Sequence, residues 1–453
     1  MSWQKVKLKE VLKQYRVQHI VQDDNEYKQV SILNDGSVVL RGSKIGKEIG
    51  RKRQFIIDLN TYPETLIFTR QLLLQGSIGI ASEDVNDCIV TENMPMFSIQ
   101  TSKIDKDFLI LFLKSEVFKS RIRKIELSGS AQKSIHEKTF LDIEFHIPKI
   151  EEQKEIVVEL LKLKSNSNSI STEIINQLDL IKQLRQAFLR EAMQGKLCHA
   201  ELVSASQETG HDLLTKIKAE KAQLIAEKKL KKEKELPLIS EDEIPFEIPE
   251  HWAWCRLGEI TKVKVGSTPS RNEPKFWKGN IPWVSSGEVA NNFIFDTRER
   301  ITQEGFENTS LIIYPKGSVL VAMIGQGKTR GQTAILKIDA TTNQNVAGMI
   351  IQHNYLISEY LWYFFLSRYE TTRVGASGGN QPALNGIKIS NTIFPLPPLN
   401  EQEQIVTKLE ELMAFCDGLE QSIKESQGYN EKLLQQVLRE ALQGEKNKYN
   451  III

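Results

Sequence analysis

Two long stretches of the chain carry apolar residues at alternating three- and four-residue spacing, which is typical of amphipathic helices. In the first stretch, residues 151–197, these positions are Ile156, Leu160, Leu163, Ile170, Ile174, Ile181, Leu184 and Phe188. In the second, residues 400–445, they are Ile405, Leu409, Leu412, Leu419, Ile423, Leu433 and Val437. Prolines precede both stretches and a glycine ends each, as expected at helix termini. At ~1.5 Å per residue, each predicted helix is roughly 60 Å long.

A narrow apolar stripe of this length needs a partner, and the other stretch is the nearest candidate. Polar Ser167, Ser426 and Asn430 interrupt the stripes, so the predicted coiled-coil faces are imperfect. The pattern favours an antiparallel helix pair with a globular part at each end and pseudo-two-fold symmetry. The alternative, in which each helix lies on its own globular part, remains open.

The helices belong to a tandem repeat with an offset of 249 residues. Leu189–Gly195 and Leu438–Gly444 are identical at six of seven positions. The same offset relates Trp3, Leu8, Glu10, Ser128, Gly129, Gln132, Phe145, Pro148, Glu152 and Gln153 to Trp252, Leu257, Glu259, Ser377, Gly378, Gln381, Phe394, Pro397, Glu401 and Gln402. Internal repetition at a fixed offset indicates a duplicated structural unit. Here the unit is a variable globular part followed by a preserved helix.

The globular parts, residues 1–150 (the first head) and 251–399 (the second head), show a mixed α/β pattern. Short β-type runs such as Val30–Leu33, Leu66–Thr69, Ser318–Ile324 and Thr333–Ile338 alternate with turn residues, and helices are predicted at Asp107–Ile122 and Ile357–Arg373. Between the halves, residues 198–250 form a linker. It combines a loop at Cys198–Gly210, a charged helix at Asp212–Glu235 and a proline-bearing stretch. Residues 446–453 form a tail. The predicted fold is therefore two α/β domains joined by a long antiparallel two-helix coiled coil.

Composition narrows the class of protein. The 453 residues suit two or three domains, and 59 Lys and Arg against 58 Asp and Glu give a net charge of +1. This balance excludes a small, uniformly basic nucleic-acid binder but permits basic patches. Four scattered cysteines without a Cys-x-x-Cys pair exclude a disulfide scaffold and a zinc ribbon. Because the chain has no run of 18 apolar residues and begins with polar and basic residues, we expect a cytoplasmic protein without a membrane span.

At this point the sequence resembles the specificity subunit of type I restriction–modification systems. The resemblance rests on the repeated Leu-Arg-Glu-Ala-(Met/Leu)-Gln-Gly, on Pro395–Val406, on the run from Ile248 to Ile260 and on Gly279–Ser285. It extends over nearly the whole chain, although Cys198–Gly210 does not resemble the family.

The resemblance implies that each head is a target recognition domain that reads one half of a split DNA site. The helices would then act as spacer and as the dock for two modification subunits, which methylate adenine with S-adenosylmethionine. Restriction subunits would complete an ATP- and Mg²⁺-dependent nuclease. The chain itself would be a non-catalytic subunit that binds no cofactor. The docking positions that follow from this resemblance lie at the two repeated helix ends, at Leu189, Arg190, Glu191, Gln194, Leu438, Arg439, Glu440 and Gln443.

The duplication indicates which residues contact DNA. Because the heads differ, their half-sites should differ, and positions shared by both heads should serve as scaffold, phosphate contacts or docking surfaces. The shared loop with Gln132 in one copy and Asn380 and Gln381 in the other either contacts phosphate or holds a reading loop. Alternatively, it is a simple helix C-terminal turn.

Basic clusters supply further candidates, since phosphate contact is the usual role of such clusters in a DNA-binding protein. In the first head they are Arg41, Lys44, Lys47, Arg51, Lys52 and Arg53, which glycines at 42, 46 and 50 predict to be a mobile loop, and Lys119, Arg121, Arg123 and Lys124 on a helix. In the second head the candidates are the basic Lys328, Arg330 and Arg373 and the polar Gln326, since arginine commonly pairs with guanine and glutamine with adenine. Solvated charged surface is the alternative interpretation of each.

Several apparent motifs favour no other activity. Ala322–Thr329 resembles a phosphate-binding loop, but a strand-like run follows it instead of a helix, so a hairpin tip is expected. Phe276, Trp277 and Trp283 either stack on bases or pack in the core. The seven histidines have no metal-ligand spacing. A DNA-modifying enzyme and a coiled-coil adaptor with two protein-binding heads remain as alternatives, and the missing catalytic motifs weigh against the enzyme.

Overall fold

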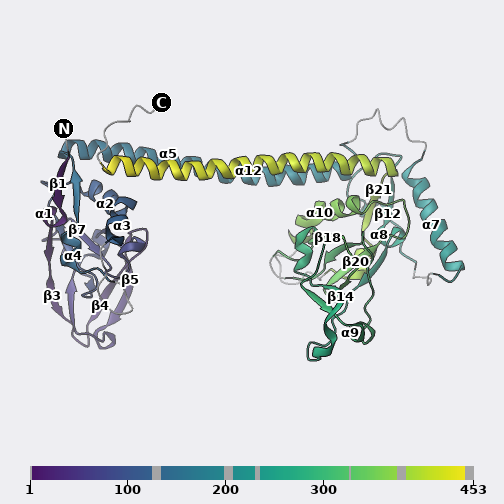
Figure 1. The fold of residues 1–453 in the computed structure, drawn as a ribbon, viewed down its shortest axis with the longest axis horizontal. Helices are drawn as coiled ribbons and strands as arrows, with labels where there is room; N and C mark the ends of the chain where they lie inside the picture. The colour runs from purple at the N-terminus through teal and green to yellow at the C-terminus, as the bar shows by residue number, and fades with distance from the viewer. Residues whose placement is uncertain are drawn as a thin grey trace. The chain divides into compact units, whose positions relative to one another are not determined.

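The computed structural model describes residues 3–124, 134–197, 208–229, 235–325, 328–374 and 384–443. The chain forms two compact units, Met1–Asn176 with Lys424–Ile453, and Gln177–Ile423. Each unit contains one head and one segment from each of two long helices, α5 (Ile150–Met193) and α12 (Leu399–Gln443) (Figure 1). The two predicted helices are confirmed within a few residues of their expected ends.

The head of the first unit is built on two antiparallel-rich sheets. One has the strand order β2 (Leu12–Tyr15), β10 (Met96–Ile99), β7 (Thr65–Phe68) and β8 (Ile78–Ile80). The other has the order β3 (Val17–Ile20), β6 (Arg53–Ile56), β9 (Ile89–Val90), β4 (Glu26–Ile32) and β5 (Val38–Ile45), and only the β9–β4 pair is parallel. Helices α2 (Lys106–Lys114), α3 (Glu116–Arg123) and α4 (Glu137–Leu141) cover the first sheet.

An aromatic cluster holds this head together. Phe68, Phe97 and Phe140 are fully buried and their ring centroids lie 4.7–5.9 Å apart. Leu442, near the end of α12, belongs to the same apolar core. Since burying a leucine side chain stabilises a fold by roughly 1.5–3 kcal/mol, this contact anchors the second helix to the first head.

The head of the second unit contains a five-stranded sheet with the order β13 (Lys262–Val265), β20 (Val346–Ile350), β17 (Val319–Ala322), β18 (Thr333–Leu336) and β15 (Phe293–Ile294). A smaller sheet joins β16 (Glu299–Ile301), β14 (Trp277–Val284) and β19 (Thr341–Thr342). Helices α9 (Gln303–Glu307), α10 (Ser358–Val374) and α11 (Gly386–Ser390) complete the head, and α7 (Gly210–Ala226) packs on it through Leu213 and Ile217.

The repeated residues build the same scaffold in both units. Strand β1 (Gln4–Lys7) pairs with β11 (Glu144–Ile147), and β12 (Ala253–Arg256) pairs with β21 (Ile393–Leu396) in the equivalent register. One-turn helices follow at α1 (Leu8–Val11) and α8 (Leu257–Ile260). The first and last strands of each head are therefore hydrogen-bonded neighbours.

Two buried side chains fix where each long helix begins. The Gln153 amide donates to the Pro148 carbonyl at 2.9 Å, and the Gln402 amide donates to the Pro397 carbonyl at 3.1 Å. Both glutamines are fully buried. Each also accepts a backbone N–H from the loop before a head helix, Gln153 from Asp105 and Gln402 from Ile357. Because a buried amide must satisfy its donors and acceptors, the same glutamine ties helix, strand end and head together in both copies.

Within each unit the two helix segments run antiparallel. In the first unit Leu160 packs against Val437 and Ala441, and the Asn430 amide donates to the Ser167 carbonyl at 3.1 Å. In the second unit Arg185 forms ion pairs with Asp417 at 2.6 Å and Glu420 at 2.9 Å. The predicted antiparallel pairing is confirmed.

Two expectations about the first head are wrong. The stretch with glycines at 42, 46 and 50 is not a mobile loop, because residues 38–45 form β5, Gly46–Glu48 form a 3-10 turn and β6 begins at Arg53. The helix predicted over Asp107–Ile122 is two helices. Ser115 adopts an extended conformation between them and its hydroxyl caps α3 by accepting the Phe118 N–H.

Candidate nucleic-acid interface

The first basic stretch lies on β5, the 3-10 turn and the start of β6. The side chains of Arg41, Lys44, Lys47, Arg51 and Arg53 are all exposed. Two cations of the stretch are neutralised within the head, since Arg51 pairs with Glu92 at 2.8 Å and Lys52 pairs with Asp23. Lys52 also donates to the Gly46 carbonyl at 2.7 Å. In the described part of the chain, no acidic partner is recorded for Arg41, Lys44, Lys47 or Arg53.

The helix cluster of the first head is engaged in internal contacts. Lys119 and Arg123 both pair with Glu116, at 3.5 and 3.0 Å. Arg121 donates to the Glu144 carbonyl of β11 and lies 5.7 Å from the centroid of the Phe112 ring. Burial lowers the pKa of the Arg121 guanidinium, as expected for a cation packed on a core aromatic ring. Only Lys124, at the end of α3, is exposed without a recorded partner in the described residues.

A buried charge network in the first head was not predicted. Glu137, at the start of α4, is 8% exposed and accepts from Arg16 at 3.1 Å and from Arg70 at 2.5 Å. Burial alone would raise the pKa of this carboxyl, but the hydrogen bonds and charges of Arg70 and Arg16 lower it overall. The three residues are far apart in sequence and are not among the positions shared by the two copies, so no sequence pattern could have joined them.

Two of the candidates in the second head, Lys328 and Arg330, lie between β17 and β18. After β17, the next element in the described residues is strand β18 and not a helix. The two strands pair antiparallel, so the hairpin expected near Ala322–Thr329 is confirmed. Lys328 is exposed and its carbonyl accepts the Tyr369 hydroxyl at 2.7 Å, while Arg330 is half-buried. Gln132, Gln326, Asn380 and Gln381 lie outside the described residues, as does the side chain of Arg373 on α10.

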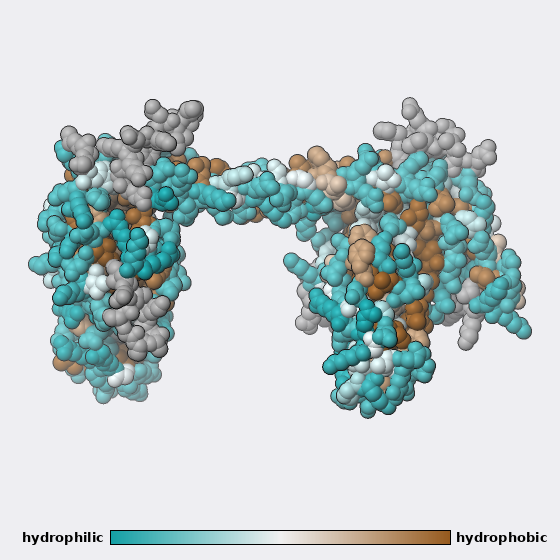
Figure 2. Space-filling view, in the orientation of Figure 1, coloured by the Kyte–Doolittle hydropathy of each residue, from teal (hydrophilic) through white to brown (hydrophobic). Residues whose placement is uncertain are grey.

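An arginine–tryptophan stack on the small sheet was also missed. The Arg271 guanidinium lies 3.8 Å from the centroid of the Trp277 ring and forms two hydrogen bonds with Glu299, at 2.5 and 2.9 Å. Trp283 is buried in the core, as the packing interpretation of this residue predicts. Trp277 is half-buried and holds the arginine at the surface, since a guanidinium over an indole face is attractive. Hydrophilic side chains predominate on the visible surface of this part of the head (Figure 2).

The repeated helix ends divide into buried and exposed positions. Leu189 lies in the apolar core of the second head. Leu438 is partly buried and packs against the apolar contact between α5 and α12 in the first unit. Arg190, Glu191 and Arg439 are exposed, and Glu440 accepts from Gln436 on the same helix at 2.8 Å. The side chain of Gln443 is outside the described residues. Within this part of the chain, the leucines serve internal packing and the exposed polar positions remain open to a partner.

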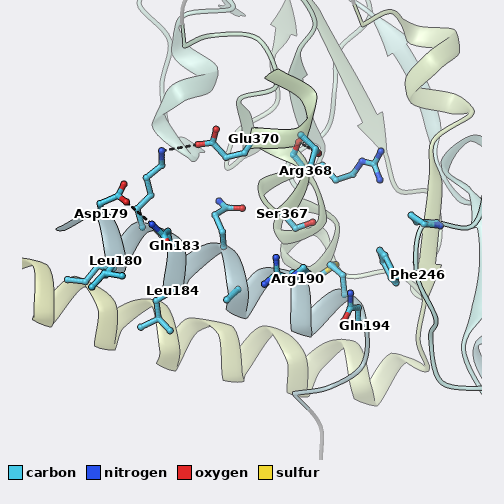
Figure 3. A pocket seen from close by; sticks show the side chains of 17 residues that line it. Asp179, Leu180, Gln183, Leu184, Arg190, Gln194, Phe246, Ser367, Arg368 and Glu370 are labelled. Atoms are coloured by element: carbon cyan, nitrogen blue, oxygen red, sulfur yellow. Dashed lines mark hydrogen bonds and ion pairs between the residues drawn. The ribbon is translucent and has the colours of Figure 1, made fainter. Parts of the chain in front are cut away.

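Arg190 and Gln194 line a groove of about 1050 Å³ in the second unit (Figure 3). One wall is α5, a second is the end of α10 with Arg368 and Glu370, and Phe246 of the linker closes one end. Lys182 pairs with Glu370 at 3.3 Å across the groove. Burial lowers the pKa of the Arg368 guanidinium, which lies 5.5 Å from the Phe364 ring centroid.

The described residues contain no cluster of three or more His, Cys, Asp or Glu side chains placed to hold a metal ion. Among the described helices, none has the length and apolar character needed to cross a membrane.

The family model described as "Type I restriction modification DNA specificity domain" matches this chain over residues 1–180 and again over residues 249–426. The chain is 30% identical over 267 residues to the type I restriction enzyme EcoAI specificity subunit of Escherichia coli, which covers 57% of this chain and 44% of that protein. It is 31% identical over 191 residues to the MjaIX specificity subunit of Methanocaldococcus jannaschii, covering 41% of this chain and 42% of that protein. The matches thus span about half, or less, of these relatives' length.

Solved structures share the fold. The HsdS subunit from Thermoanaerobacter tengcongensis has a TM-score of 0.57 at 16% identity, with 98% of this chain and 97% of that chain covered. A chain from a type I R-M system, solved to explain complex assembly and conformational transition, has a TM-score of 0.65 at 16% identity and 98% coverage of both chains.

Proposed function

Because the chain belongs to the type I restriction modification DNA specificity domain family through both of its halves, we propose that it is the DNA-recognition subunit of such a system. In this role it reads a split, asymmetric DNA site, one half with each head. It performs no chemistry of its own.

One observation carries the proposal. Both units reuse the same strand pair and the same buried glutamine, and both contain an antiparallel pair of helix segments, yet they hold heads with different sheets. A duplicated scaffold with unlike heads suits a duplex whose two strands present unlike half-sites. A protein that bound two copies of one ligand would have no use for heads that differ.

Partner subunits dock, in this proposal, on surfaces that the duplication provides twice. Modification subunits that methylate adenine would use the exposed polar positions at the repeated helix ends. The groove beside Arg190 and Gln194 supports this, because it combines cations with the half-buried aromatic side chain of Phe246, as protein interfaces commonly do. Restriction subunits then join the assembly in the cytoplasm. S-adenosylmethionine, ATP and Mg²⁺ are expected to bind those partners and not this chain.

The test is a methylation map. The chain is expressed with its modification subunit in a host that lacks adenine methylation, and modified adenines are located across the genome. We expect a two-part motif with a gap of fixed length, unlike half-sites and one adenine modified on each strand. Methylation by the chain alone, binding of labelled S-adenosylmethionine by the purified chain, or the absence of any motif with the partner present would each contradict the proposal.

A further inference from the structure

The edge strand of the first head is exposed to an unusual degree. Seven of the eight residues of β5 are exposed, and they include apolar Val39 at 37%, Leu40 at 46% and Ile45 at 42%. A strand on a half-buried sheet normally hides every second side chain, and an exposed apolar edge strand invites unwanted pairing. Together with β4, this strand forms a two-stranded antiparallel ribbon at the edge of the five-stranded sheet (Figure 1).

A β-bulge presents Arg41 from this ribbon. Gln29 pairs with Gly42 and Val30 pairs with Leu40, so Arg41 is the extra residue of the bulged strand. Gly42 has a φ of +134°, and a Cβ placed there would contact nothing within 4 Å. Bulges turn a side chain out of the sheet, and a strand glycine beside open space lets another backbone approach. Among the described residues, no packing contact explains this feature.

The charge of the ribbon favours nucleic acid as the molecule that approaches. In the described residues, Arg41 and Lys44 have no recorded acidic partner, whereas Arg51 and Lys52 nearby are paired. Lysine is depleted at protein–protein interfaces, so the exposed Lys44 favours nucleic acid over a protein partner. Free cations interleaved with apolar side chains fit the major groove, where arginine pairs with guanine and apolar groups contact the thymine methyl.

We propose that the β4–β5 ribbon enters the major groove of one half-site and that Arg41 reads a base there. The inference rests on the proposed function and adds to it the element and the residue that determine specificity. The major groove admits a two-stranded β-ribbon.

The experiment replaces Arg41 in the full chain and maps methylated adenines with the modification subunit present. Arg41→Ala removes both the charge and the planar guanidinium that can donate two parallel hydrogen bonds. Arg41→Lys keeps the charge and removes only the planar guanidinium. Lys13→Ala is the matched control, because Lys13 is exposed on β2 of the same head and has no recorded partner in the described residues.

We expect both Arg41 variants to relax discrimination at one base pair of one half-site by roughly 5- to 150-fold. The other half-site and the gap should remain unchanged, and the control should retain the full motif. Thermal unfolding should be unaltered, since the Arg41 side chain is exposed.

Three results would overturn the inference. If Arg41→Lys retains the motif while Arg41→Ala only weakens binding uniformly, Arg41 contacts phosphate. If the motif and the affinity are unchanged but the partner subunit no longer assembles, the ribbon binds protein. If nothing changes, the ribbon takes no part. In each case the wild-type chain still directs methylation, so the proposed function stands or fails separately.

Discussion

At the scale of single residues, a tryptophan–glutamate hydrogen bond occurs at the repeated positions of both copies. The Trp252 indole N–H donates to Glu401 at 2.7 Å in a buried site that also contains His251, whereas Trp3 donates to Glu152 at 3.4 Å in a more open one. The two copies therefore make the same contact in different environments. Removing the glutamate should therefore lower the free energy of unfolding by different amounts in the two copies, since an unpaired buried donor destabilises a fold more than an exposed one.

Glu401→Ala should destabilise the second unit by about 1–3 kcal/mol, because it leaves the buried Trp252 N–H without an acceptor. Glu152→Ala is the matched control and should cost clearly less. Chemical denaturation followed by hydrogen exchange in each head would measure both. Equal losses would show that burial of the tryptophan does not set the strength of the contact.

Glu137 should make the first head sensitive to acid. Its folded-state pKa lies below the ordinary 4.5 of a glutamate, so its ion pairs stabilise the fold above that pH. This stability is lost as the pH falls through the lowered pKa, where the carboxylate becomes protonated. We expect the wild type to be more stable than Glu137→Gln at neutral pH, and the difference to vanish in acid. Thermal unfolding midpoints over a pH series would measure it, and a constant difference would contradict the assignment.

At the scale of elements, the long helices combine internal and external surfaces. Leu189 is buried against the second head while Arg190 beside it faces solvent and the groove. One turn of helix can thus hold the head and present a charge to a partner.

Arg190→Glu should weaken assembly with the modification subunit by reversing a charge in the groove, with unfolding unaltered. Arg439→Glu makes the same change at the repeated position of α12. Because a partner is expected on each copy, either variant alone should leave one of two subunits bound, and the double variant should leave none. Native mass spectrometry would count them. Full assembly in the double variant would show that the helix ends take no part in the interface.

The sequence predicts elements where spacing is regular and fails where distant residues meet. The periodicity of α5 and α12 is sufficient to predict both helices and their pairing. Asn430 interrupts the apolar stripe of α12 in the sequence. In the structure its side-chain amide donates hydrogen bonds to Ser167 and Ser171 of α5, a match that only the antiparallel register reveals. Gly42 suggested a loop because glycine with a positive φ is typical of both turns and β-bulges, and the sequence does not distinguish the two. The Arg70–Glu137 pair joins residues 67 apart and carries no local signal.

At the scale of the whole molecule, helix length is expected to determine which DNA sites are read. Four residues inserted into each of α5 and α12 add ~6 Å of helix. With base pairs stacked ~3.4 Å apart, the recognised gap should widen by one to two base pairs while both half-sites are kept. A methylation map of the variant would show the new gap. An unchanged gap would mean that the helices do not set the spacing.

The pairing of the first and last strands of each head has an evolutionary consequence. Because β1 lies beside β11 and β12 beside β21, everything between them starts and finishes at one place on the scaffold. A gene carrying two similar stretches of coding sequence is prone to recombination at those stretches. An exchange there would replace a whole head and leave the strand pair, the glutamine and the helices intact. Under the proposed function, one such genetic event would give a cell population a new target sequence without any change to the partner proteins.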